Sequence, residues 1–240
     1  MKLKDMDIVY VVKDSAYNDE LRYSLRSVAK NFPHRKVYFY GGKPVGLKPD
    51  VQVVVNQVGD TKYDRVQNML KMICENDDIS DDFVLFNDDF FVLNKQEDPF
   101  PRRVSVDTLA DYIVWIEIKN GMRPTPYTAE LKKTLAEIWK KGFACPESYE
   151  LHVPMVLNKK KLLNVINSCN GLHGIRTIYG NMYDDCEYLV YDNDVKIVDL
   201  DSVPSVSEDD FVSTSDESFA DGEVGKFIRD MFPKKCKYER

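Results

Sequence analysis

Three features that would place the chain in a special class are missing from its sequence. No apolar run approaches the roughly 20 residues that span a bilayer, and the N-terminal run at residues 8–12 is too short for a signal-peptide core. The five cysteines form no C-x-x-C pair, which argues against a zinc site and fits reduced thiols. A net charge of -7 argues against a large basic face for nucleic acid. We therefore expect a cytoplasmic protein with no membrane span.

The first 95 residues contain an alternation of strand and helix patterns. Continuous β-rich runs at residues 8–12, 37–40, 51–55 and 83–86 predict strands covered on both faces. Apolar residues at helical spacing follow the first run, at 18–32, and the third, at 63–73. This alternation predicts an α/β fold with a mixed, mostly parallel sheet flanked by helices, in which ligands gather at the carboxyl ends of the strands.

The second half of the chain is less regular. Helical patterns occur near residues 128–141, 158–166 and 223–231, and segments rich in Tyr and Val at 148–157 and 188–203 are expected to be extended. The glycines at 174 and 180 favour a loop over residues 171–181 with a close backbone approach. No repeat, linker or low-complexity tract divides the chain, so we expect one domain.

The run FVLFNDDFFVL carries a polar triplet, Asn87-Asp88-Asp89, inside an apolar stretch. Burying two carboxylates without partners would be costly, so the pair calls for a compensating cation or for solvent. At a strand end, these oxygens would suit Mg²⁺ or Mn²⁺ bridging the protein to a diphosphate. An Asn-Asp turn between two strands is the alternative, and the triplet alone leaves both interpretations open.

Five segments resemble, in order, blocks of the Stealth family of sugar-phosphate transferases. They are DIVYVVKD, ELRYSLRS, FNDDFF, HVPMVLNKKKL and FPKKCKYE, and they extend over nearly the whole chain. The resemblance implies the A-type glycosyltransferase fold, with Asp88 and Asp89 as metal or diphosphate ligands and Asn87 supporting them. In the first block, only Asp14 and Ser15 correspond to the family's residues, which makes them candidates for substrate contact. In the last block, Cys236 stands where the family usually has Ser.

Two pairs of residues on predicted helices are candidates for binding the nucleotide and its phosphates. Arg22 and Arg26 are four positions apart, so both project from one helix face and could hold phosphate oxygens. Arg65 and Asn68 lie on the helix before the FVLF strand, which in A-type glycosyltransferases often carries nucleotide-contacting residues. A solvated helix surface is the alternative for both pairs.

Three residues of the second half are candidates for catalysis. His152, in the segment that resembles the family's His-x-Pro block, could act as a general base or orient the leaving group, although a lone His is commonly structural. The resemblance also suggests Arg176 as a cation for phosphate. Asp216 could be a second metal ligand or the base for an acceptor, with helix capping as its alternative role. The acid-rich stretch 184–201 lacks the spacing of a calcium loop, and most of it is expected to be solvated.

Together these observations predict a metal-dependent glycosyltransferase that uses a nucleotide-diphosphate sugar, Mg²⁺ or Mn²⁺, and a carbohydrate or other hydroxyl-bearing acceptor. Residues 1–240 would form one catalytic domain, in which residues 1–95 bind the nucleotide sugar and metal and residues 96–240 carry the acceptor and catalytic half. The first alternative is Stealth-type transfer of a hexose 1-phosphate, which releases a nucleoside monophosphate. Further alternatives are an inactive sugar-nucleotide-binding module and a DNA-base glycosyltransferase, although a nucleic-acid acceptor is not favoured.

Overall fold

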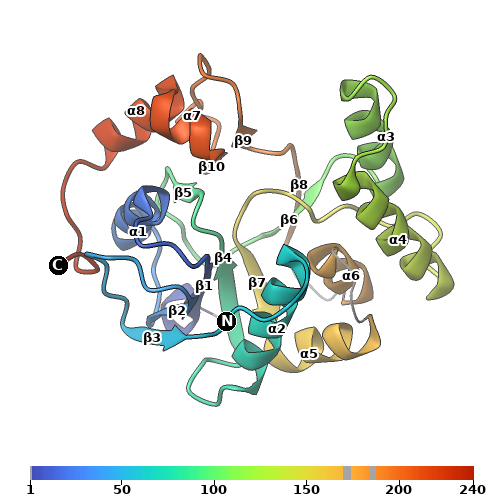
Figure 1. The fold of residues 1–240 in the computed structure, drawn as a ribbon, viewed down its shortest axis with the longest axis horizontal. Coiled ribbons are helices and arrows are strands. Elements are labelled where there is room, and N and C mark those ends of the chain that lie inside the picture. The colour runs from blue at the N-terminus through green and yellow to red at the C-terminus, as the bar shows by residue number, and fades with distance from the viewer. Residues whose placement is uncertain (1, 170–173, 184–187) are drawn as a thin grey trace.

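A computed structural model describes residues 2–169, 174–183 and 188–240, and a five-stranded sheet lies at its centre (Figure 1). The strands, in the order β3-β2-β1-β4-β7, are β3 (Val51–Val54), β2 (Val37–Gly41), β1 (Asp7–Val12), β4 (Asp82–Phe86) and β7 (Met155–Asn158). The first four are parallel, and β7 is antiparallel to β4. The predicted mixed, mostly parallel sheet is therefore confirmed.

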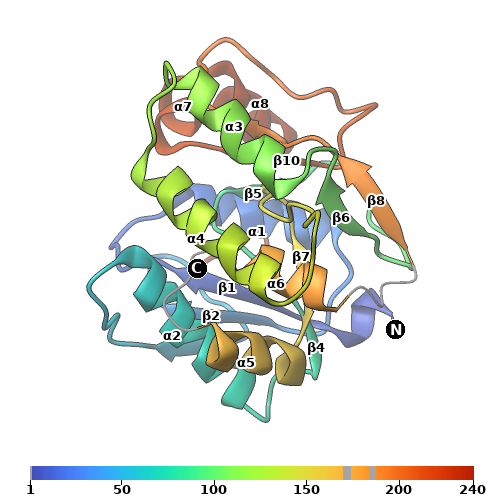
Figure 2. The same ribbon diagram turned by 90° about the vertical axis from the view of Figure 1, so that its right-hand side faces the viewer.

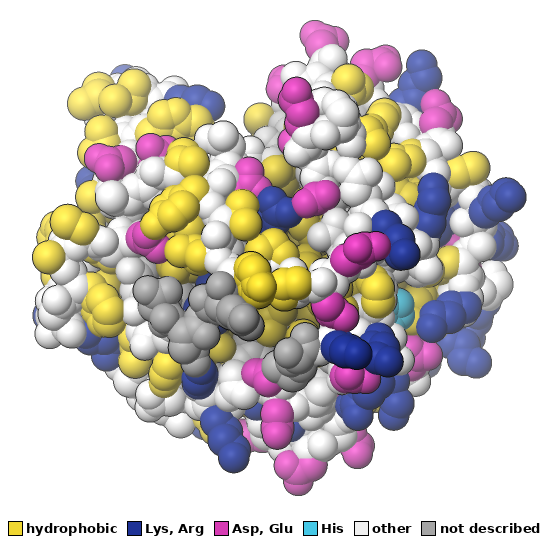
Figure 3. All heavy atoms as spheres, turned by 180° about the vertical axis from the view of Figure 1, so that it is seen from behind, with side chains coloured by type: hydrophobic (Ala, Val, Ile, Leu, Met, Phe, Trp, Pro, Cys, Tyr) yellow, Lys and Arg dark blue, Asp and Glu magenta, His cyan; other side chains and the backbone are white. Residues whose placement is uncertain are grey.

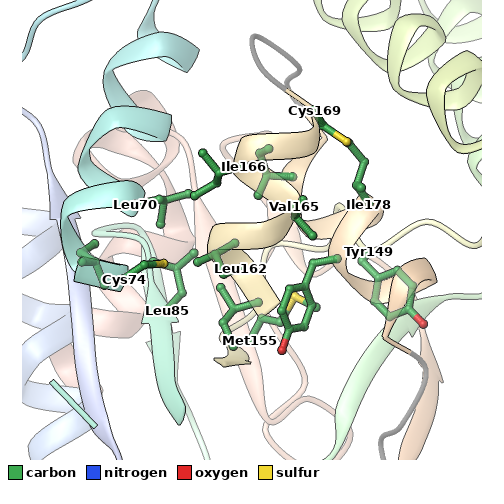
Figure 4. Packing of buried hydrophobic residues seen from close by; sticks show 14 of the residues in the cluster. Leu70, Cys74, Leu85, Tyr149, Met155, Leu162, Val165, Ile166, Cys169 and Ile178 are labelled. Atoms are coloured by element: carbon green, nitrogen blue, oxygen red, sulfur yellow. The ribbon is translucent and has the colours of Figure 1, made fainter. Parts of the chain in front are cut away.

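Alternate residues of the central strands face two separate cores, because side chains of a strand point to opposite faces of the sheet. Val9 and Leu85 pack in one core with α2 (Lys62–Glu75) and α5 (Lys159–Ser168), and Figure 4 shows Leu70, Leu85 and Leu162 together there. Ile8 and Val84 pack in the other core with α1 (Asp19–Asn31). Burial on both faces explains why these strands read as continuous apolar runs.

Local signals in the sequence fix where the main helices begin. The Asn18 side chain accepts from the backbone N–H of Leu21 at 2.9 Å and caps α1. Thr61 and Asp64 form a reciprocal capping box at the start of α2, and Asn158 caps α5. These caps satisfy backbone donors that would otherwise have no partner at the first turn.

A second layer is built mainly from the later part of the chain (Figure 2). A three-stranded sheet joins β5 (Phe90–Val92), β10 (Phe211–Thr214) and β9 (Lys196–Ile197), and α7 (Asp216–Asp221) and α8 (Glu223–Met231) cover it through a third core. Helices α3 (Leu109–Lys119) and α4 (Pro126–Lys140) form a hairpin that projects on the other side. The remaining elements are the short helix η1 (Leu3–Asp5), the paired strands β6 (Arg102–Ser105) and β8 (Leu189–Asp192), and α6 (Ile175–Met182). No helix of the described ranges is long and apolar enough to cross a membrane.

Two segments differ from their sequence-based description. The loop expected over residues 171–181 is wrong for its described part, because Ile175–Met182 forms α6. The expected close approach at Gly180 does occur, since a Cβ there would lie 2.4 Å from the ring of Tyr149. Helix α3 was not expected, because its sequence LADYIVWIEIK is apolar on nearly all sides and lacks a helical period.

The C-terminal segment is fastened to α1 by a buried ion pair. Arg26 donates to both carboxylate oxygens of Glu239, at 2.7 and 2.8 Å, and to the carbonyls of Phe232 and Pro233. The Glu239 side chain is fully buried. The fold therefore brings into contact two of the segments that resemble Stealth blocks, ELRYSLRS and FPKKCKYE.

Candidate active site

The candidate site lies at the carboxyl ends of β1 and β4. The chain leaves β1 toward β2 on one side, whereas β4 lies on the other side, so the strand order changes direction at this point. A crevice forms at such a switch point in open α/β sheets. Lys13 follows β1 and the Asn87-Asp88-Asp89 triplet follows β4 at this edge.

The triplet follows the end of β4 and forms the turn that leads to β5, so the turn expected between two strands is present. The N–H of Phe90 donates to the carbonyl of Asn87 at 3.3 Å and closes the turn between β4 and β5. Asp88 accepts from the Asn18 amide at 2.6 Å. Asp89 accepts from the Ser213 hydroxyl at 3.0 Å and from the Lys196 ammonium at 3.2 Å.

A cavity of about 500 Å³ opens beside this turn. It is lined by Lys62, Tyr63, Val66, Gln67, Leu70, Leu85, Asn87, Asp89, Phe90, Tyr112, Tyr127, Glu150, Leu151, His152, Ile175, Arg176 and Lys196. The lining combines an apolar and aromatic wall with a few charged groups, which is the usual composition of a small-molecule site.

His152 is held at the cavity by Asp194. Its ring Nδ1 lies 2.9 Å from both carboxylate oxygens of Asp194, and its backbone N–H donates to the same carboxylate at 3.0 Å. Burial raises the pKa of Asp194, but the bonds and charge of His152 and the charge of Lys196 outweigh it, so the pKa lies below its ordinary value. The carboxylate therefore accepts a hydrogen bond from Nδ1–H, which leaves Nε2 as the ring nitrogen that can accept a proton.

Arg176 brings a partly buried positive charge to the same cavity. One terminal nitrogen donates to the carbonyl of Val153 at 2.7 Å, whereas Nε is buried without a hydrogen-bond partner. Burial lowers the pKa of the guanidinium, and the carboxylates of Glu150 and Asp194 act in the opposite direction. A buried donor with no partner is costly, so this side chain is suited to an anionic ligand.

A group of carboxylates adjoins the cavity on the side of α1. Glu20 is buried and accepts from the Thr214 hydroxyl at 2.7 Å. Burial, together with the charges of Asp88, Asp89 and Asp216, raises the pKa of Glu20 to about 7. The pKa of Asp88 is also raised, mainly by burial and then by the charge of Asp89.

Four of the residues predicted from the sequence share the cavity: Asn87, Asp89, His152 and Arg176. Asp88 is next to Asp89 but does not line the cavity, and its carboxylate accepts a hydrogen bond from Asn18. Asp216 is exposed at the first turn of α7, 3.4 Å from Lys13. The helix cap is the preceding residue, Ser215.

The remaining predicted residues lie outside the cavity lining. Arg26 is engaged by Glu239, and Arg22 lies 3.1 Å from Asp19 and 3.6 Å from Glu239. On α2, two exposed side chains hold the preceding loop instead, because Arg65 donates to the carbonyl of Gly59 and Asn68 to that of Val58. After β1, Asp14 is exposed, and the Ser15 hydroxyl donates to the carbonyl of Tyr17 at 2.7 Å.

Several cavity residues were not singled out from the sequence. Asp194 lies in the acid-rich stretch 184–201, most of which was expected to be solvated and of which residues 184–187 lie outside the described ranges. Asp194 is itself an exposed residue, but its carboxylate is hydrogen-bonded to His152, a contact that was not expected. The sequence did contain a signal for an extended segment with one buried face, because the polar residues Asp194 and Lys196 alternate with Val195, which packs in a core. The apolar stripe of α2 likewise contains Tyr63, Val66 and Leu70, which line the cavity.

The oxygen donors at the turn suit only one kind of metal site. Among the described residues, no group of three or more His, Cys, Asp or Glu side chains could hold a metal ion. Asn87 and Asp89 both line the cavity, and Mg²⁺ commonly binds through one or two carboxylates together with substrate phosphates. The pair therefore fits a metal that a bound diphosphate helps to hold, and does not fit a site made of protein ligands alone.

A known structure shares this arrangement of strands and helices. The galactosyltransferase LgtC, solved with donor and acceptor sugar analogues, aligns over 97% of this chain and 97% of its own, with 13% identity and a TM-score of 0.52. An active-site mutant of LgtC aligns over 80% of this chain and 75% of its own, with 15% identity and a TM-score of 0.42. The glycosyltransferase GlyE of Streptococcus pneumoniae aligns over 78% and 45%, with 10% identity and a TM-score of 0.39. No protein-family model and no curated protein matches the sequence, so membership of the Stealth family is not confirmed. The alignment with LgtC over nearly the full length of both chains shows that this protein has the same fold.

Proposed function

We propose that the cavity binds a nucleotide-diphosphate sugar and that the protein transfers the sugar to an acceptor hydroxyl. One observation carries this proposal: a single cavity at the carboxyl edge of the sheet contains an oriented histidine, an arginine whose Nε is buried without a hydrogen-bond partner, and a pair of oxygen donors. The fold shared with LgtC supports the choice of reaction class.

The charged groups of the cavity suit the diphosphate of such a donor. Arg176 and Lys196 supply positive charge, and the buried Nε of Arg176 gains the partner that it lacks. Mg²⁺ or Mn²⁺ held by Asn87 and Asp89 would neutralise charge on the leaving phosphate. The wall formed by Tyr63, Val66 and Leu70 offers an apolar surface to the nucleoside.

His152 is the group that would take the acceptor proton. The acceptor oxygen attacks the anomeric carbon, its proton passes to Nε2 of His152, and the bond from that carbon to the phosphate oxygen breaks. The nucleoside diphosphate leaves with the electron pair of that bond. Asp194 holds the ring in the tautomer that has Nε2 unprotonated, and its charge stabilises the imidazolium that forms.

A screen of nucleotide sugars with Mg²⁺, Mn²⁺ or a chelator tests this proposal, with released nucleotides identified by mass spectrometry. Glycosyl transfer releases a nucleoside diphosphate, and we expect the chelator to reduce its release. A nucleoside monophosphate would instead indicate Stealth-type attack on phosphorus. Binding without turnover would indicate an inactive module, and the absence of both binding and turnover would overturn the proposal.

The variant Asp194→Asn tests the role given to His152. An asparagine amide would donate to Nδ1 and place the ring proton on Nε2, so we expect kcat to fall roughly 100-fold with little change in KM for the donor. Asp201→Asn makes the same chemical change at an exposed position outside the cavity and should leave kcat unchanged. Equal rates for the two variants would contradict the role given to Asp194 in setting the tautomer of His152.

A further inference from the structure

The hairpin of α3 and α4 carries a group of exposed apolar side chains that the candidate site does not use. Val114, Trp115 and Ile118 are 53%, 46% and 57% exposed and lie on α3, and Met122 in the following turn is 73% exposed. We call these four residues the apolar tip. In Figure 3, apolar side chains gather on the projecting lobe at upper left, which is this hairpin seen from behind.

The tryptophans of the chain are concentrated on this hairpin. The sequence contains two, Trp115 and Trp139, and they are 46% and 52% exposed. A large aromatic ring with a polar N–H is a side chain that membrane proteins concentrate at the boundary between lipid and water. The placement of both tryptophans on one projecting hairpin therefore suggests contact with such a boundary.

Met122 has a strained backbone conformation, and packing of its side chain inside the protein does not compensate for that strain. Its φ is 60°, directly after Gly121 at 67°, and a non-glycine residue in this left-handed region is strained. The exposed Met122 side chain gains little from burial inside the protein. A surface that covers the side chain would supply that missing contact.

The charge around the apolar tip has the opposite sign to that of the whole chain. Residues 109–141 contain six Lys or Arg and four Asp or Glu, a local net charge of +2 in a chain of net charge -7. The acid nearest the tip in sequence, Glu117, is paired with Lys132 at 2.7 Å. Lys119 and Arg123 are exposed, and the Lys119 ammonium lies 3.8 Å from the centre of the Trp115 ring.

We propose that the apolar tip docks on a membrane surface that contains anionic phospholipids. The apolar side chains would enter the interfacial region, and Lys119 and Arg123 would lie among the negatively charged headgroups. A second copy of this chain suits the surface less well, because symmetric contact would oppose the same cations to one another. The proposal does not depend on the transfer reaction. Docking of the hairpin would bring the membrane next to the cavity, because Tyr112 of α3 and Tyr127 of α4 line that cavity.

Sedimentation of the full chain with vesicles tests the proposal. We expect binding to vesicles of phosphatidylcholine with phosphatidylserine, weaker binding as salt rises, and much less binding to phosphatidylcholine alone. The double variant Trp115→Ser with Ile118→Ser should weaken binding at least about tenfold, because two apolar anchors are lost. In Trp139→Phe, Trp115 is the remaining tryptophan, and its emission should shift to shorter wavelength when anionic vesicles are added.

Matched controls separate docking from a loss of folding. Val54→Ser with Val58→Ser replaces two residues that are 68% and 69% exposed and lie outside the hairpin, so binding should not change. All variants should unfold in a single transition with a midpoint within a few degrees of the parent, because the replaced side chains are half-exposed or exposed. The proposal is overturned if anionic vesicles do not bind, if the hairpin variant binds as the parent does, or if the tip instead forms a dimer that the variant dissociates.

Discussion

Glu20 is a buried carboxyl among other carboxylates, and this makes the stability of the fold depend on pH. Burial first, and then the charges of Asp88, Asp89 and Asp216, raise its pKa to about 7, while the bond from Thr214 acts in the opposite direction. Two cations adjoin this group, Lys196 beside Asp89 and Lys13 beside Asp216. Burial lowers the pKa of Lys13, but the charges of Asp88 and Asp216 outweigh it, so the pKa is raised. Between the ordinary pKa of glutamate and pH 7, the folded state binds the Glu20 proton more strongly than the unfolded state does. The stabilisation from that proton is therefore lost as pH rises through 7.

The variant Glu20→Gln should reduce this dependence on pH. Its amide oxygen can still accept from Thr214 but carries no charge that must be buried. We expect the free energy of unfolding of the parent to fall by roughly 1–3 kcal/mol between pH 5.5 and pH 8 through Glu20, and the variant to lose most of that slope. Urea titrations in the presence of a chelator measure it. Glu75→Gln, at an exposed position, should keep the parent slope, and an equal slope in Glu20→Gln would contradict the assignment.

At the scale of residues, the sequence predicts the chemistry of the site better than its geometry. The triplet at the end of β4 and His152 were expected to be functional candidates, and the structure brings three of these four residues to one cavity. The partners of Asp88 and Asp89 are 70, 107 and 124 positions away, and no local pattern could identify them. Arg26 illustrates the converse, because the spacing predicts an exposed helix face but the distant Glu239 covers it.

At the scale of elements, the C-terminal segment depends on α1 through the pair of Arg26 and Glu239. The side chains are 8% and 0% exposed, and the pair raises the pKa of Arg26. The pKa of Glu239 is lowered overall, because the bonds from Arg26 and the backbone outweigh the effect of burial. Removing one partner of such a pair leaves the other buried without compensation.

We expect Glu239→Gln to lower the free energy of unfolding by about 2–4 kcal/mol, because the Arg26 charge would remain buried without its carboxylate. Chemical denaturation at neutral pH measures the loss. Glu208→Gln makes the same change at an exposed position and should cost less than about 0.5 kcal/mol. Similar stability of the two variants would show that the C-terminal segment is not fastened by this ion pair.

Elements were predictable where a period and an end signal coincide. Helix α1 combines a clear apolar stripe with a cap at Asn18 and Pro33 beyond its end, and its predicted range agrees with the structure. Helix α3 has no polar face to reveal its period, and α6 carries glycine where a tyrosine ring packs on it. The rest of the fold determines which faces of α3 are exposed and what α6 packs against. These long-range contacts override local propensity in both helices.

At the scale of the whole molecule, the cavity is a product of long-range assembly. Its wall joins α2, the end of β4, the hairpin of α3 and α4, residues 150–152, α6 and β9. A ligand that contacts segments so far apart in sequence is bound only when they are assembled. Binding to the folded state should therefore raise the stability of the whole domain.

A nucleoside diphosphate should raise the unfolding temperature of the parent but not that of a variant whose cavity is filled. Uridine, guanosine, cytidine and adenosine diphosphates with Mg²⁺ are the probes, and a ligand at 100 times its Kd stabilises by about 2.7 kcal/mol, or roughly 5–10 °C in a chain of this size. In Val66→Trp, the larger ring projects from α2 into the cavity of about 500 Å³, so the shift should shrink or disappear. Val58→Trp makes the same change at an exposed position outside the cavity and should keep the full shift. Equal shifts in both variants would place nucleotide binding elsewhere on the molecule, whereas a shift lost only in Val66→Trp locates it in this cavity independently of any catalytic assay.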